Sequence, residues 1–62
     1  MDDKYHVIWH TFLFRNSPVH DKEFDNLTEA IAEYNNLLRT VISLDYIKIV
    51  WGTSVIMEYD AN

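Results

Sequence analysis

The chain has 62 residues and a mass of 7.4 kDa, which predicts a single small domain over residues 1–62. Its 48% hydrophobic and 24% charged residues are typical of a globular protein rather than a disordered one. Ten acidic residues against five basic ones give a formal net charge of −5, so we expect no direct binding to nucleic-acid phosphates.

The sequence contains no cysteine, which excludes disulfide scaffolds, thiolate metal sites and cysteine nucleophiles. An apolar run such as Val7–Trp9 is far shorter than the roughly 20 residues that span a bilayer. The first residues are acidic, where a secretory signal is basic. We therefore expect a cytoplasmic protein that has no membrane segment.

The small size and the aromatic content together predict self-association. A domain of this length buries only about 60% of its unfolded surface, and small scaffolds often gain stability by association. Aromatic residues make up 15% of the chain, more than one small core is expected to bury. We therefore expect a homodimer, with Trp9, Trp51 and Tyr59 as candidates for an aromatic interface.

The first half of the chain predicts one clear strand and one uncertain element. Residues 4–14 are dominated by β-branched and aromatic side chains, which favour a strand. Both of its faces carry large apolar side chains, so we expect both to be covered at least in part. Residues 15–18 predict a turn that contains Pro18. Residues 19–24 are either a short, charged edge strand or a loop.

The strongest pattern in the sequence is that of an amphipathic helix. Asn26 can cap it, with Glu29 three residues later to complete a capping box. We expect it to end between Arg39 and Ile42, where β-branched residues weaken helical propensity. Apolar residues recur at spacings of three and four, which defines a buried face: Leu27, Ala30, Ile31, Tyr34, Leu37, Leu38 and Val41.

The last third of the chain is rich in strand formers and is divided by Gly52. A type II′ turn at Gly52-Thr53 predicts a hairpin of strands 46–51 and 54–59, whereas a bulge at Gly52 predicts one long bent strand. We favour the hairpin because both strands then have ordinary lengths. The predicted fold is α+β: a small antiparallel sheet, in the order ββαββ or βαββ, with one amphipathic helix packed on one face.

The polar residues predict no chemistry. His6 and His10 on one strand would lie about 13 Å apart, too far to share a metal ion. His20-Asp21 has no neighbouring nucleophile motif, and we interpret it as a loop pair. With a single Gly, no phosphate-binding loop can form. We therefore predict no catalytic residue, no metal site and no cofactor, and a chain that is not an enzyme.

Three acidic residues, Asp25, Glu29 and Glu33, are spaced four apart, and we call them the acidic triplet. On a helix this spacing aligns them along one side, with no Lys or Arg at the positions that would relieve their repulsion. One interpretation is a solvated surface whose first acids also favour the helix dipole. The other is a docking surface for a basic partner.

These patterns favour a non-enzymatic protein-interaction module. We expect a small acidic inhibitor or accessory factor, of the kind that mobile elements encode, that occupies the surface of a partner protein. The expected partner is a protein with a basic or nucleic-acid-binding surface, reached by mimicry of a nucleic acid. Two alternatives stay open: a structural or assembly subunit whose role is self-association, and a small oligomeric enzyme with a site between subunits.

Overall fold

The computed structural model of the chain describes residues 4–12 and 17–61. These residues form one four-stranded antiparallel sheet and one helix, which confirms the predicted small α+β fold in its ββαββ form. The elements in chain order are β1 (Tyr5–Thr11), β2 (His20–Phe24), α1 (Leu27–Thr40), β3 (Leu44–Trp51) and β4 (Ser54–Asp60).

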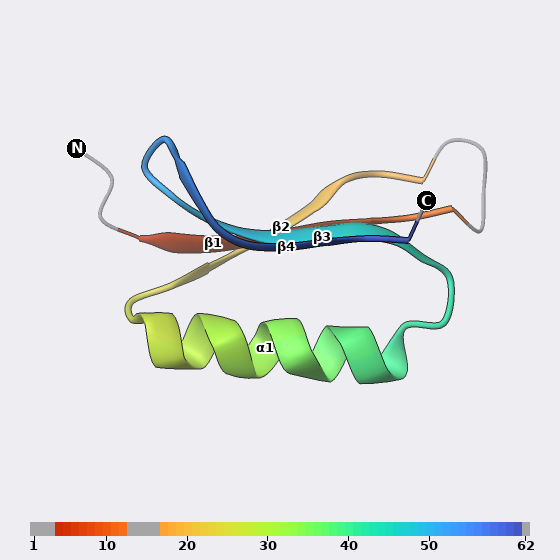
Figure 1. Ribbon diagram of the computed structural model, residues 1–62, viewed down its shortest axis with the longest axis horizontal. Coiled ribbons are helices and arrows are strands. Elements are labelled where there is room, and N and C mark those ends of the chain that lie inside the picture. Colours follow the sequence, from red (N-terminus) through yellow and green to blue (C-terminus); the bar gives the residue numbers. More distant parts are fainter. Residues whose placement is uncertain (1–3, 13–16, 62) are drawn as a thin grey trace.

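The sheet has the strand order β2-β1-β3-β4, so β1 and β3 are central and β2 and β4 are the two edges. Val7 lies opposite Lys22 of β2 on one side and opposite Ile49 of β3 on the other. The helix α1 runs beneath one face of the sheet, and no described element covers the other face (Figure 1). We call that uncovered side the open face.

Helix α1 forms where local capping and the apolar pattern agree. The side-chain oxygen of Asn26 accepts a hydrogen bond from the backbone N–H of Glu29 at 2.9 Å, which satisfies one of the unpaired donors of the first turn. At the other end, the backbone N–H of Val41 donates to the Leu37 carbonyl at 2.9 Å. The helix ends at Thr40, within the predicted interval, with Arg39 in its last turn.

The core lies between α1 and the two central strands. Val7, Ile47 and Ile49 are fully buried, and they meet Ala30 and Tyr34 of the helix. The predicted apolar helix face is confirmed: three of its residues are buried, and the others pack against the core as partly buried side chains, namely Leu27, Ile31, Leu38 and Val41.

The hairpin prediction at Gly52 is confirmed, and the single bent strand is wrong. Gly52 has a φ of 62°, and no other residue among those described has a positive φ, Thr53 included. A positive φ at the first turn position alone is the signature of a type II′ turn. A register shift does occur, but beside the turn: Ile49 pairs with Met57 and Val50 with Val55, which leaves Ile56 as an extra residue in β4.

Two predicted strand boundaries and the interpretation of one residue pair need correction. The first strand ends at Thr11 rather than Phe14, and residues 13–16, which include the first two residues of the predicted turn, lie outside the described residues. The third strand begins two residues early, at Leu44, because that side chain is buried in the core. Residues 20–24 are a strand and not a loop, so His20 and Asp21 are not a loop pair.

The two faces of β1 were expected to be covered at least in part, and they differ in how they are covered. Helix α1 buries Val7, whereas His6, Ile8 and His10 on the open face are half-buried beside the neighbouring strands. A single helix of 14 residues supplies only one layer. The open face therefore stays accessible among the described residues, and its side chains are mostly polar.

Candidate interaction surface

The structure separates the members of the acidic triplet. Asp25 precedes the N-cap residue Asn26 and therefore lies outside the helix, so the expected row of three acids along α1 is wrong. Asp25 forms an ion pair with Lys4, and Glu33 lies 3.5 Å from the ammonium of Lys22. Lysines from β2 and from the residue before β1 thus supply the cations that pair with these two acids.

Glu29 and Glu33 are the two members of the triplet that lie on the helix, and of these two Glu29 is exposed whereas Glu33 is half-buried. The position of Glu29 in the first turn places its carboxylate near the positive end of the helix dipole. The sequence pattern missed the lysine partners because they are distant in the chain. The surface around Glu29 is acidic, but much of its charge is balanced locally.

The three predicted interface aromatics do not form one patch. Register places Trp9 and Tyr59 on either side of Ile47, on the face that α1 covers. Trp51 lies four residues further along β3, which corresponds to about 13 Å. Trp9 is half-buried and stacks on His20, with ring centroids 5.0 Å apart.

Trp51 and Tyr59 are the accessible aromatics, with 45% and 46% of their surfaces exposed. Trp51 also stacks on Tyr5, with ring centroids 5.8 Å apart. Of the predicted aromatic site, these two side chains are therefore available to a partner, and Tyr59 belongs to the edge strand β4.

Strand β4 is the least protected element of the fold. The backbone of α1 approaches β1, β2 and β3 but not β4. Val55 and Ile56 are 50% and 40% exposed, although both are large and apolar. Six of the seven residues of β4 are exposed, and only Met57 is half-buried. An exposed apolar edge strand is a template for pairing with another chain.

Strand β2, the other edge of the sheet, is protected against pairing with another chain. Strand β2 has five residues, three of them charged, and α1 approaches it closely. Short, charged edges are a common device against unwanted pairing. The two edges therefore differ in kind, and β4 is the one suited to contact a partner.

One hydrogen bond shows which backbone groups of β4 point toward β3 and which point outward. The N–H of Ala61 donates to the carbonyl of Asp45 at 3.0 Å, which continues the ladder between β3 and β4. Since hydrogen-bonding direction alternates along an antiparallel strand, Met57 and Tyr59 direct their backbone groups toward β3. Glu58 and Asp60 direct theirs outward, away from the sheet.

A hollow of about 330 Å³ lies where the helix stops short of β4. Ile42, which is 97% exposed, forms part of its rim. The remaining lining residues come from the end of α1, the start of β3 and the end of β4: Leu38, Arg39, Val41, Leu44, Tyr59 and Ala61. The hollow therefore adjoins the helix side of the C-terminal end of β4, where Tyr59 lies.

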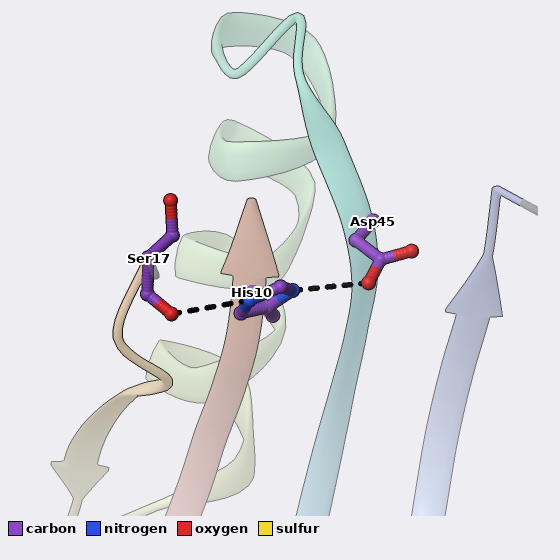
Figure 2. Close-up of polar contacts among 3 residues, drawn as sticks. All are labelled: His10, Ser17 and Asp45. Carbon is purple, nitrogen blue, oxygen red and sulfur yellow. Dashed lines mark hydrogen bonds and ion pairs between the residues drawn. The ribbon is translucent and has the colours of Figure 1, made fainter. Parts of the chain in front are cut away.

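At the far end of the sheet, His10 bridges two segments (Figure 2). Its Nδ1 lies 3.0 Å from Oδ2 of Asp45, and its Nε2 lies 3.2 Å from the backbone carbonyl of Ser17. Both partners offer oxygen acceptors, so a ring nitrogen that carries a proton donates to the oxygen that it faces. The two contacts tie β1 to the start of β3 and to residue 17.

The other two histidines lie on opposite faces of the sheet. His6 Nδ1 lies 2.9 Å from the Asp21 carboxylate, which crosses from β2 to β1 on the open face. His20 lies on the opposite face, against Trp9, so it is not oriented by Asp21. Among the described residues, no group of three or more side chains has the arrangement of a metal site.

Tyr34 of α1 has a shifted pKa. Burial, and to a lesser extent the negative charge of Glu58, raises the pKa of the Tyr34 hydroxyl above its ordinary value.

In the part of the chain that the structure describes, no helix combines the length and the apolar character that a membrane crossing requires.

Comparisons of the chain with protein-family models, with curated proteins and with solved structures found no match. Among the surfaces described above, the edge of β4 combines exposed apolar side chains with outward backbone groups.

Proposed function

We propose that this chain is a non-enzymatic protein-interaction module, a small acidic inhibitor or accessory factor that binds a partner protein through strand β4. The single observation that carries the proposal is the exposure of Val55, Ile56 and Tyr59 on an edge strand that the helix does not approach. Recognition by strand addition uses the backbone for affinity and alternate side chains for specificity.

The charge of the molecule defines the class of partner. A net charge of −5 repels acidic surfaces and attracts basic ones, including surfaces that bind nucleic acids. Occupation of such a surface by this chain would compete with the partner's own ligand. The acidic triplet contributes to the overall field, whereas β4 supplies the contact surface.

The test compares two lysine substitutions of exposed apolar residues. Ile56→Lys places a cation on β4, and Val19→Lys places the same charge just before the opposite edge strand. Cross-linked capture from the native host should recover one partner with wild type and with Val19→Lys, and lose it with Ile56→Lys. Equal capture by all three proteins would overturn the proposal, provided that thermal melts show both variants folded.

A further inference from the structure

The hollow beside the C-terminal end of α1 combines apolar walls with one cation. We propose that it binds a small amphiphile, a monocarboxylate whose apolar chain lies in the hollow and whose carboxylate pairs with Arg39. This inference goes beyond the proposed function and does not depend on it, because the ligand binds beneath the sheet and makes no use of the backbone of β4.

The hollow has the size of a small-ligand site. Its volume of about 330 Å³ is at the lower end of the range for ligand pockets, which is about 300–1,000 Å³. Leu44, which is 6% exposed, lines it together with the half-buried Leu38 and Val41. All three belong to the hydrophobic core or pack against it, so an apolar chain in the hollow contacts side chains that are continuous with the core.

The rim of the hollow exposes apolar surface that a ligand can bury. Ile42 is 97% exposed and Tyr59 is 46% exposed, and both line the hollow. Ile42 lies in the short connection between α1 and β3, where polar residues and glycine are usual. Burial of apolar surface is favourable in proportion to the area removed from water. A chain that covers these two side chains should therefore bind more tightly as its length increases.

Arg39 gives the hollow its positive charge. It is the one charged residue among those that line the hollow, and it forms no ion pair with another described residue. Tyr59 is on the helix side, so the acids next to it in β4, Glu58 and Asp60, are on the open face. A guanidinium can hold a carboxylate through two parallel N–H donors, which makes a carboxylate the complementary head group.

The rest of the molecule favours the opposite charge. A net charge of −5 attracts cations and repels anions. The carbonyl end of α1 adds a partial negative charge, which Arg39 in the last turn offsets. Nonspecific contact with this protein therefore favours a cationic amphiphile, and a preference for a carboxylate would be specific to the hollow.

The probes are octanoate, octylammonium and octanol, which share one chain length and differ in the head group. Titrations followed by NMR of the isotope-labelled protein give dissociation constants at concentrations too low for micelles. We expect octanoate to bind about tenfold more tightly than octylammonium, with octanol between them and the largest shifts at the lining residues. Hexanoate, which is two methylenes shorter, should bind about fivefold more weakly than octanoate. Equal affinity for octanoate and octylammonium, or shifts confined to other surfaces, would overturn the inference.

Two matched pairs of variants assign the binding to the hollow. Arg39→Gln and Lys48→Gln remove the same charge, but Lys48 lies on the open face opposite Glu58. Arg39→Gln alone should abolish the preference for octanoate, and Arg39→Glu should transfer it to octylammonium. Ile42→Ser should weaken octanoate binding about threefold, whereas Val19→Ser, at a 57% exposed position beside the opposite edge strand, should not. Equal effects within either pair, in variants that thermal melts show to be folded, would also overturn the inference.

A second copy of the chain is the other candidate occupant of the hollow. It would shift the NMR signals of the lining residues when the protein alone is diluted. If dilution shifts these signals and octanoate does not, the hollow is a contact between copies and the inferred ligand is wrong. If octanoate shifts them at a protein concentration where further dilution has no effect, the inference is supported.

Discussion

Lys22 of β2 lies 3.5 Å from Glu33 of α1, and this ion pair joins an edge strand to the helix beneath the sheet. The pair neutralises one acid of the acidic triplet, in which the sequence pattern indicates no nearby Lys or Arg to relieve the repulsion. A second lysine, Lys4, pairs with Asp25. Exposed ion pairs contribute about 0–1 kcal/mol each to stability, so their main effect is on the charge that the surface presents to a partner.

Charge reversal on the helix tests whether the acidic triplet binds the partner. The Glu29→Lys, Glu33→Lys double variant should lose about 1 kcal/mol or less of stability, since exposed helix charges and surface ion pairs contribute little. If the triplet is part of the interface, partner capture should fall strongly, and the Glu29→Gln, Glu33→Gln variant should show an intermediate loss. Capture at the wild-type level by both would mean that the surface is only solvated.

Most of the fold could be predicted from periodicity, and the helix best of all. The apolar spacing from Leu27 to Val41 and the Asn26 cap act locally, so the sequence contains the whole signal. The hairpin at Gly52 was predictable for the same reason, because one positive φ satisfies the turn. Strand ends were less predictable, since Leu44 joins β3 through tertiary burial and not through propensity.

The candidate site was less predictable, because it depends on relations between elements. Val55 and Ile56 are ordinary strand residues in the sequence, and they matter only because β4 is an edge that α1 does not approach. The bridge between His10 and Asp45 joins residues 35 apart in the chain. The lysine partners of Asp25 and Glu33 are likewise contributed by other elements, so spacing on the helix could not indicate them.

Truncation of the buried helix leucine should be severely destabilising. Leu37 is 8% exposed and belongs to the core, whereas its neighbour Leu38 is only half-buried. Leu37→Ala should therefore lose about 2–5 kcal/mol of unfolding free energy, and Leu38→Ala less, because its cavity opens toward solvent. Urea melts measure both values. A loss under about 1 kcal/mol for Leu37→Ala would contradict the packing described here.

Self-association at micromolar concentration remains the prediction for the isolated chain. The exposed apolar edge of β4 favours it, and the acids of β4 oppose antiparallel pairing about Glu58 or Tyr59. A homodimer should therefore strengthen as salt screens these charges. Size exclusion with light scattering at low and high salt measures the mass, with Ile56→Lys as the variant expected to be monomeric. A monomer that melts cooperatively at every salt concentration would contradict the prediction of self-association.

The two hydrogen bonds of His10 should contribute measurably to stability. His10→Phe keeps a ring that can stack on Tyr46, as the imidazole does with centroids 5.8 Å apart, but it loses the contacts to Asp45 and Ser17. We expect a loss of about 1–3 kcal/mol, since one acceptor is charged and both contacts are half-buried. His6→Phe is the matched control, because the carboxylate of its partner Asp21 is 50% exposed. Equal urea melts for the two variants would contradict this role.

The raised pKa of Tyr34 should make the protein sensitive to alkali. In the unfolded chain Tyr34 loses its proton near pH 10, whereas burial raises its pKa in the folded chain. Above pH 10 the unfolded state therefore binds fewer protons than the folded state, so the free energy of unfolding falls as the pH rises. Tyr34→Phe conserves the shape of the side chain and should lose about 1.5 kcal/mol or less at neutral pH, while its stability declines less steeply in alkali. Glu58→Gln removes only the smaller cause of the raised pKa, the negative charge of Glu58. Its stability in alkali should therefore decline less steeply than that of wild type but more steeply than that of Tyr34→Phe. Urea melts at a series of pH values measure the slopes, and identical slopes for wild type and Tyr34→Phe would show that ionisation of this hydroxyl is not linked to folding.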